Sequence, residues 1–462
     1  ILPDLTRRAK RQYECLNYLL DVLSIASSKL RERGYSSSVI NALEKRGLIK
    51  RVRKEVRRNP LADIDRGEDV EIKLTSDQHQ IVKLLIDMLD KRCFHPALLF
   101  GVTGSGKTIV YVELVRKILS QNRSAIILVP EIALAWQMVR RFMQYFGEDV
   151  VVLHSQLSNG ERYDTWKRLR EGDAKIVIGA RSAIFAPLRN LGIIVVDEEH
   201  DSSYKQEDLE SSFPLNYNAR DVAVKRARDC NALVVLGSAT PSLESFSNAQ
   251  SGKYTLYALP KRIDNRPLPT VHVVDMTREP FQKKQRPIFS KSMRLKIKGC
   301  LKRNEQIVLL QNRRGFSPFI NCSSCGESLK CISCHISLTY HRTKEVSTVK
   351  CHYCNFSKSV PSACESCGVE GLDFDGIGTQ KVEEELTKQF SNVRVIRMDV
   401  DTTGWKGAHD KLVERFRRRE ADILLGTQMV AKGLDFPNVT LVGVISADTG
   451  IHMPDFRAAE RS

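Results

Sequence analysis

Short apolar runs alternate with helical patterns over two stretches of the chain. Between residues 74 and 258, six near-continuous apolar runs are bounded by turns, at residues 97–100, 125–130, 150–154, 175–179, 192–197 and 233–238. Strands that are buried on both faces of a sheet have this pattern, because neither face meets water. Four later runs repeat it, at residues 306–313, 392–399, 422–428 and 440–446. The pattern predicts an α/β protein with two parallel-sheet lobes wrapped by helices.

The N-terminal residues have a different pattern. Residues 12–47 read as three short helices, the last with apolar Val39, Ile40 and Leu43 and with Gly47 placed as a C-cap. The alternating apolar and basic residues that follow could form a β-wing, so we predict a winged-helix module. The alternative is a small helical connector with a solvated basic face. The predicted boundaries are a module at 1–60, a linker at 61–73, a first lobe at 74–259, a second lobe at 260–318 and 372–462, and a cysteine-rich insertion at 319–371.

Composition narrows the class of protein. The chain has 462 residues, 42% of them hydrophobic and 27% charged, which excludes a disordered or collagen-like chain. No apolar run approaches the roughly 18 residues that a membrane helix needs, so we expect no membrane span. The net charge of +17 favours a polyanionic partner, and residues 1–60 contribute about half of it. Lys/Arg clusters at 7–11, 50–58, 283–286 and 415–419 would bind phosphates in a salt-dependent way.

A phosphate-binding loop follows the first apolar run. The sequence GVTGSGKT matches the pattern GxxxxGK[ST], with a strand pattern before it and a helix pattern after it. The glycines let backbone N–H groups converge on a phosphate at a helix N-terminus. Lys107 would reach the β- and γ-phosphates of ATP, and the Thr108 hydroxyl would hold Mg²⁺. The predicted nucleotide-binding residues are Gly101, Val102, Thr103, Gly104, Ser105, Gly106, Lys107 and Thr108 in the loop, with Gln78, Gly433 and Asp435 elsewhere in the chain.

Two carboxylates end another apolar run. Residues 191–200 read LGIIVVDEEH, a strand pattern followed by Asp197 and Glu198. In Mg·ATP hydrolysis, Asp197 would hold the metal, usually through water, and Glu198 would polarise the attacking water. The alternative is an ordinary acidic strand end, which the neighbouring phosphate loop disfavours. We therefore predict Lys107, Asp197 and Glu198 as the catalytic residues.

Polar residues at further strand ends indicate how ATP is used. Ser238 and Thr240, in GSAT, could relay the state of the phosphate site to bound nucleic acid. The second lobe offers a comparable cluster beginning at Gly426, made of Thr427, Gln428, Lys432, Gly433 and Asp435. A small kinase needs no second lobe of this kind, whereas a motor converts the opening and closing of two lobes into displacement.

Eight of the twelve cysteines form CxxC pairs between residues 322 and 367. Two such turns complete a tetrahedral thiolate site for Zn²⁺. Sixteen residues separate Cys334 from Cys351, within the usual zinc-ribbon spacing. This spacing joins the second and third pairs and leaves the first and fourth for the other site. Disulfides and iron–sulfur clusters are the alternatives. The predicted sites are Cys322, Cys325, Cys364 and Cys367, and Cys331, Cys334, Cys351 and Cys354.

Together these motifs resemble the PriA family of primosomal replication-restart helicases in superfamily 2. The resemblance rests on GVTGSGKT, DEEH followed by DSSYKQ, GSATPS, NRRGF, LLGTQMVAKGLDFPNVTLVGVISAD and the cysteine octet. It implies two RecA-like lobes, the same nested pair of structural zincs, and a 3′→5′ DNA helicase that recognises stalled forks and promotes primosome assembly. By the same carry-over, Thr75 and Gln78 lie on the adenine side, and DNA coupling involves Arg181, Tyr204, Lys205, Gln206, Ser238, Thr240, Thr427, Gln428, Lys432 and the aromatic-rich loop up to Tyr217.

The resemblance also implies cofactors and partners, and it indicates which parts of the family's proteins we expect this chain to lack. The expected cofactors are ATP, Mg²⁺ and two Zn²⁺. The expected partners are branched and single-stranded DNA, other replication-restart proteins, single-strand-binding protein and the replicative helicase loader, in a bacterial cytoplasm or in a plastid or mitochondrion. The chain starts at Ile1 and stops at Ser462, so we expect a fragment lacking the 3′-end-binding domain, the last helicase motif with its arginine fingers and the C-terminal domain. Two rival functions are a fork-binding scaffold in which ATP hydrolysis is dispensable and an RNA helicase with zinc ribbons.

Overall fold

The computed structural model describes most of the chain in two compact units, Ile1–Asn59 and Pro60–Ser462. None of the helices in the described part is both long and apolar enough to cross a lipid bilayer. The described residues are 9–52, 58, 60–61, 73–130, 132–206, 215–263, 267–280, 287–311, 320–322, 324–342, 347–351, 353–370, 372–373, 378–399, 402, 408–427, 430, 436–451 and 457–461.

The first unit is a three-helix cluster. Its helices are α2 (Lys10–Val22), α3 (Ser27–Glu32) and α4 (Ser37–Lys45), as the apolar spacing predicts. Their core is small and is formed by Cys15, Leu16, Leu30, Ile40 and Leu43. Residues 48–52 form no strand, and residues 53–57 of the predicted wing lie outside the described residues. The winged helix therefore stays a prediction.

The first lobe of the second unit is built on a seven-stranded parallel sheet. Its order is β3-β4-β2-β5-β8-β1-β9. All six predicted strands are present, and a seventh, β9, lies at the edge beside β1. The bounds are β1 His95–Gly101, β2 Ser124–Leu128, β3 Val150–Leu153, β4 Ile176–Gly179, β5 Leu191–Asp197, β8 Leu233–Ser238 and β9 Thr255–Leu259.

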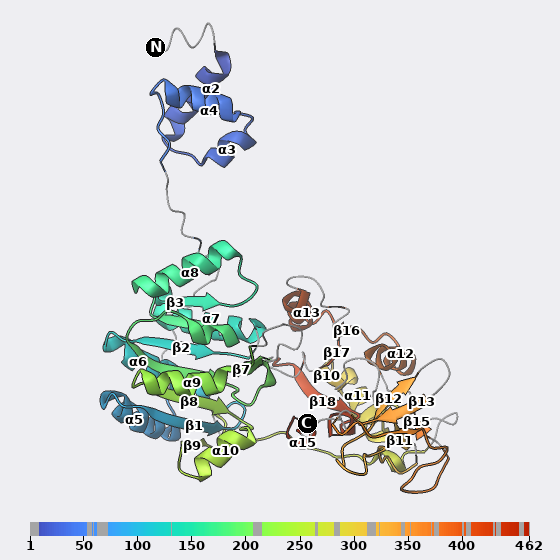
Figure 1. Cartoon of the computed structure of the whole chain (residues 1–462). Helices are drawn as coiled ribbons and strands as arrows, with labels where there is room; N and C mark the ends of the chain where they lie inside the picture. Colours follow the sequence, from blue (N-terminus) through green and yellow to red (C-terminus); the bar gives the residue numbers. More distant parts are fainter. Residues whose placement is uncertain are drawn as a thin grey trace. The chain divides into compact units, whose positions relative to one another are not determined.

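Helices cover both faces of this sheet (Figure 1). One face is buried under α5 (Ser76–Asp90), α6 (Lys107–Ser120) and α7 (Ile132–Phe146). The other is covered by α8 (Asn159–Glu171) and α9 (Ala219–Asp229). Because the buried strands are apolar on both faces, they appear in the sequence as continuous runs rather than as alternation. Shorter elements complete the lobe: η1 Gly147–Asp149, η2 Arg181–Phe185, η3 Ser202–Tyr204, β6 Lys205–Gln206, β7 Tyr217–Asn218 and α10 Leu243–Gln250.

The second lobe repeats the architecture on a smaller scale. Its parallel sheet has the order β16-β17-β10-β18, from the four predicted runs. Helices α11 and α12 pack on one face of this sheet, and α13 packs on the other. The bounds are η5 Met276–Arg278, α11 Lys291–Lys302, β10 Gln306–Gln311, α12 Thr379–Gln389, β16 Val395–Met398, α13 Ala408–Arg417, β17 Ile423–Gly426, β18 Val439–Ile445, α14 Asp448–Ile451 and α15 Ala458–Arg461.

The insertion between β10 and α12 consists of short antiparallel strands. Strand β11 (Asn321–Cys322) pairs with β15 (Leu372–Asp373), which brings the two ends of the insertion together. Strands β12 (Thr339–Arg342), β13 (Ser347–Lys350) and β14 (Ser357–Ser359) form a separate three-stranded sheet. Its apolar core is small and includes two cysteines, Cys331 and Cys351. So small a core is typical of a module that needs metal to fold.

Candidate nucleotide site and cysteine clusters

Three segments of the first lobe with predicted functional residues meet at one edge of its sheet. They are the phosphate loop, the acidic turn after β5 and the GSAT segment at the end of β8. Strand β8 lies between β5 and β1, so the carboxyl ends of all three strands are neighbours. Asp197 of β5 pairs in register with Gly237 of β8, and Phe100 of β1 pairs with Ser238. The carboxyl edge of a parallel sheet is where such folds bind ligands. The topology therefore brings the phosphate loop, the acidic turn and the GSAT segment together.

The phosphate loop is closely packed, and two of its glycines have a left-handed backbone conformation. Gly104 has φ +82° and Gly106, the N-cap of α6, has φ +79°. A Cβ on Gly101 would lie 2.6 Å from Ser105 Oγ, so only glycine fits there. Lys107 is 9% exposed and its Nζ donates to the carbonyl oxygen of Gly101 at 2.9 Å. The lysine amine is thereby held inside the loop, where a phosphate would find it.

Gln78 connects helix α5 to this loop. The side chains of Thr75 and Gln78 form a capping box at the start of α5. The amide Nε2 of Gln78, which is 1% exposed, donates to the carbonyl oxygen of Ser105 at 2.7 Å. Of the two residues assigned to the adenine side by resemblance, Gln78 thus contacts the phosphate loop directly, and Thr75 contacts Gln78. Their contact with a nucleotide stays a prediction.

Asp197 lies half-buried beside α6. The Tyr111 hydroxyl donates to its Oδ1 at 2.9 Å, and the Tyr204 hydroxyl donates to its backbone oxygen at 2.6 Å. Burial, assisted by the charge of Glu198, raises the pKa of Asp197 to about 6. A Cβ on Gly237 would lie 1.8 Å from the Tyr111 hydroxyl oxygen, so glycine is required for this approach. A desolvated carboxylate with a raised pKa suits a hard divalent cation, because the positive charge of the cation would stabilise the ionised carboxylate.

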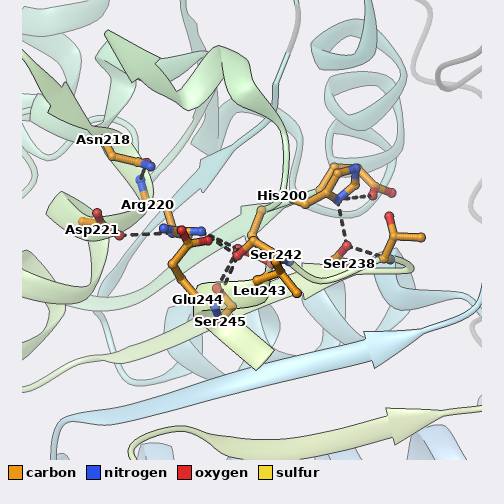
Figure 2. Close-up of polar contacts among 12 residues, drawn as sticks. His200, Asn218, Arg220, Asp221, Ser238, Ser242, Leu243, Glu244 and Ser245 are labelled. Atoms are coloured by element: carbon orange, nitrogen blue, oxygen red, sulfur yellow. Dashed lines mark hydrogen bonds and ion pairs between the residues drawn. The ribbon is translucent and has the colours of Figure 1, made fainter. Parts of the chain in front are cut away.

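The residue after Asp197 has a strained backbone. Glu198 has φ +47°, a left-handed conformation that non-glycine residues rarely adopt. Its Oε2 lies 3.6 Å from His200 Nδ1. His200 Nδ1 in turn lies 2.8 Å from Ser238 Oγ, and Figure 2 shows His200 pointing toward Ser238. Ser238 Oγ accepts a hydrogen bond from the Thr240 N–H at 2.9 Å. The acidic turn is thereby joined to the GSAT segment.

Glu199 is the centre of a buried polar cluster. Its carboxylate accepts hydrogen bonds from the Ser242 N–H at 2.7 Å, from Ser242 Oγ at 3.0 Å and from Ser245 Oγ at 2.7 Å. Arg220 of α9 donates from Nη1 to Glu199 Oε2 at 3.2 Å and to Ser242 Oγ at 2.6 Å, and Figure 2 shows it reaching toward Ser242. Sequence reasoning missed this cluster. The only signal was a third polar residue in a row after a buried strand.

Several of the predicted DNA-coupling residues of the first lobe lie around a small hairpin, whereas Ser238 and Thr240 lie at the end of β8. Strands β6 and β7 pair Lys205 with Asn218 and Gln206 with Tyr217. Arg181 Nη1 donates to the Lys205 carbonyl oxygen at 2.8 Å, and its guanidinium carbon lies 5.9 Å from the centre of the Tyr217 ring. Tyr204, in contrast, is 1% exposed, so its ring faces the core and not a surface strand. Residues 207–214 of the predicted aromatic-rich loop, Phe213 included, lie outside the described residues.

In the second lobe only part of the predicted cluster is described. Thr427 is buried, and its N–H donates to the Met398 carbonyl oxygen at 3.3 Å. Four predicted residues lie outside the described part of the chain: Gln428, Lys432, Gly433 and Asp435.

The eight paired cysteines form two clusters with the membership that the spacing predicts. One contains Cys322, Cys325, Cys364 and Cys367, and the other Cys331, Cys334, Cys351 and Cys354. Within each cluster all four sulfurs lie within 4.8 Å of one another, and three Sγ–Sγ distances are 3.5, 3.6 and 3.7 Å. None of the twelve cysteines forms a disulfide. Four sulfurs placed tetrahedrally about 2.3 Å from one zinc would be about 3.8 Å apart, so the clusters fit this ion.

Backbone N–H groups at the turns point toward the sulfurs. The N–H of Ser324 donates to Cys322 Sγ at 3.3 Å, and that of Ser366 donates to Cys364 Sγ at 3.4 Å. Backbone donation, first from Cys367, lowers the pKa of the Cys364 thiol to about 7. Such turns favour thiolates, which are the form that binds metal.

Comparisons with known proteins identify a family that the chain resembles. Residues 75–249 match the family model "DEAD/DEAH box helicase", and residues 374–457 match "Helicase conserved C-terminal domain". The "Replication restart protein PriA" of Bacillus subtilis (strain 168) is 47% identical over 462 residues, covering 99% of this chain and 56% of the relative. That of Synechocystis sp. (strain ATCC 27184 / PCC 6803 / Kazusa) is 44% identical over 433 residues, covering 92% of this chain and 51% of the relative.

Solved structures also match the chain. The structure of RecG bound to a three-way DNA junction has a TM-score of 0.47 and 15% identity, covering 85% of this chain and 44% of that one. The chain spans about half the length of the curated relatives it matches.

Proposed function

Because the chain belongs to the PriA family of replication-restart helicases, we propose that it forms the ATP-hydrolysing motor of a 3′→5′ DNA helicase. The motor would act on stalled or abandoned replication forks and promote primosome assembly. The chain spans only part of its relatives, so the proposal concerns the protein in which this motor works. Membership of the family supports the coarse function, and the arrangement of the site supports the use of ATP.

One observation carries the proposal. The phosphate loop, Asp197 and Ser238 lie at the ends of three adjacent strands, and Tyr111 joins the helix after the loop to Asp197. In that arrangement Lys107 would bind the β- and γ-phosphates of ATP, and Asp197 with Thr108 would hold Mg²⁺. The bound Mg²⁺ would neutralise charge on the transferring phosphoryl group. Glu198 orients and polarises the attacking water.

The hairpin side of the lobe supports the coupling of hydrolysis to a nucleic-acid strand. His200 contacts Ser238, and Arg181 contacts the hairpin that follows the acidic turn. Tyr204, the residue before the hairpin, also donates a hydrogen bond to the Asp197 carbonyl oxygen, which joins the hairpin to the acidic turn. We assign Arg181, Lys205, Gln206 and Thr240 to the coupling of strand binding to hydrolysis. Tyr204 would act from inside the fold, on Asp197, and not by stacking on a base.

The two cysteine clusters would each hold one structural zinc. A shell of four thiolates leaves no open position for a substrate, so the metal would stabilise the insertion and not catalyse. Since the insertion has only a small apolar core, loss of the metals would unfold it. Iron–sulfur clusters use the same ligands, and metal analysis separates the two possibilities.

Two rival functions make different predictions. In a fork-binding scaffold, ATP hydrolysis would be dispensable for restart. In an RNA helicase, structured RNA would stimulate hydrolysis better than forked DNA. The expected protein partners are other restart proteins, single-strand-binding protein and the helicase loader, in a bacterial cytoplasm.

Lys107→Ala tests the proposal, with the exposed Lys253→Ala as its control. We expect Lys107→Ala to abolish ATP turnover and restart activity together, and Lys253→Ala to retain both. If Lys107→Ala loses turnover but still restarts replication, the scaffold function is correct. A preference of the wild type for RNA as activator would favour the RNA helicase.

A further inference from the structure

The segment that follows the edge strand β9 lies along the phosphate loop. The Val102 N–H donates to the Leu259 carbonyl oxygen at 3.2 Å, and the Ile263 N–H donates to the Gly104 carbonyl oxygen at 3.0 Å. These two backbone hydrogen bonds fix residues 259–263 beside residues 102–104. The side chains of this segment are thereby positioned at the loop, although they lie more than 150 residues away in the sequence.

Two side chains of the segment cover the glycines of the loop. A Cβ built on Gly104 would lie 3.7 Å from Cγ of Arg262, so the arginine stem runs over this glycine. A Cβ on Gly106 would lie 2.9 Å from Cδ1 of Ile263 and 2.4 Å from Nε2 of Gln78. The side chains of Ile263 and Gln78 therefore both lie beside Gly106, although the two residues are near opposite ends of the lobe's sequence.

Two buried polar atoms here have no hydrogen-bond partner among the described residues. Nε of Arg262 is buried and finds no hydrogen-bond acceptor in the described part of the chain. The hydroxyl of Ser105, a residue that is 3% exposed, is also without a hydrogen bond there. A buried donor without an acceptor is destabilising. Ile263, in contrast, is 38% exposed, so an apolar surface remains open beside the unpaired donor.

We propose that Arg262 and Ile263 form a wall of the nucleotide site and bind the adenosine half of ATP. Ile263 packs against the adenosine moiety, and Arg262 donates a hydrogen bond to it. An apolar surface next to a fixed donor suits a flat ring with acceptor nitrogens, whereas phosphate alone would not use the isoleucine. The inference rests on the proposed nucleotide site, since it assigns further residues to it.

Calorimetric titration of the chain with ADP and with pyrophosphate tests this assignment. Both ligands use the phosphate loop, but only ADP carries the adenosine. We expect Arg262→Gln and Ile263→Ala to weaken ADP binding about tenfold, the effect of one hydrogen bond or one apolar contact, and to leave pyrophosphate binding unchanged. The neighbouring, exposed Lys261→Ala is the matched control and should bind both ligands like the wild type.

Two results would overturn the inference. One is ADP binding of wild-type strength by both variants, and the other is an equal loss of ADP and pyrophosphate. Thermal melting without nucleotide verifies that each variant folds, and Ile263→Val, which keeps most of the apolar surface, should retain most of the affinity. If the wild type binds neither ligand, or if Lys107→Ala binds both normally, the proposed nucleotide site itself fails.

Discussion

Arg220 forms a buried ion pair with Glu199, the residue next to the proposed water-polarising Glu198. The Nη1–Oε2 distance is 3.2 Å, and the two side chains are 11% and 0% exposed. Arg220 lies two residues after Asn218, which ends the hairpin and caps helix α9. The ion pair therefore connects the hairpin to the acidic turn through the interior of the lobe.

Arg220→Ala should destabilise the first lobe strongly, because it leaves the Glu199 carboxylate buried without its cation. Breaking a buried pair in this way costs about 3–5 kcal/mol. Urea denaturation of the variant measures the loss. Arg228→Ala, an exposed arginine on the same helix, is the control and should change the free energy of unfolding by less than about 0.5 kcal/mol. Equal effects of the two substitutions would show that the pair contributes nothing.

The Glu198→Gly variant should be more stable than the Glu198→Ala variant. Its φ of +47° suits glycine, whereas alanine in that conformation is less stable by about 1 kcal/mol. We expect Glu198→Gly and Glu198→Ala both to lose ATP turnover, and Glu198→Gly to be the more stable in urea. Should the two variants unfold at the same urea concentration, the turn would not hold this backbone conformation in solution.

Ser238→Ala should separate nucleotide binding from hydrolysis. The hydroxyl of Ser238 contacts His200 and accepts a hydrogen bond from the Thr240 N–H, but among the described residues it makes no hydrogen bond to the phosphate loop. Loss of one or two hydrogen bonds predicts a roughly tenfold fall in DNA-stimulated turnover with unchanged ADP affinity. The exposed Ser247→Ala provides the comparison. A fall in ADP affinity equal to the fall in turnover would assign Ser238 to nucleotide binding.

Metal analysis should find two zinc ions per chain. Cys331→Ser should remove one of them and make the insertion sensitive to limited proteolysis, while the first lobe remains folded. Cys93→Ser, at an exposed cysteine outside both clusters, should retain both ions. Iron in place of zinc, a single ion in the wild type, or an unchanged proteolysis pattern in Cys331→Ser would contradict the assignment.

The sequence predicted what depends on local pattern. The continuous apolar runs identified six strands of the first sheet, because central parallel strands are buried on both faces. Strand β9 was missed: at the sheet edge only Tyr257 and Leu259 are buried, so the run is interrupted by exposed residues. The cysteine pairing followed from the spacing alone, since each CxxC turn is a local structure.

Contacts between distant side chains could not be predicted in this way. The pairing of Glu199 with Arg220 spans 21 residues, and that of Tyr111 with Asp197 spans 86. No periodicity marks such partners. For the same reason the approach of Arg262 and Ile263 to the glycine loop appears only in the fold. The orientation of Tyr204 into the core was likewise invisible, because aromatic residues occur both on DNA-binding surfaces and in cores.

The most direct test of the motor is its rate of ATP turnover with and without single-stranded DNA, measured on the protein in which this motor works. We predict that saturating DNA raises the rate severalfold and that added salt reverses the effect, because strand binding relies on phosphate contacts. A rate that stays the same at every DNA concentration would contradict the proposal.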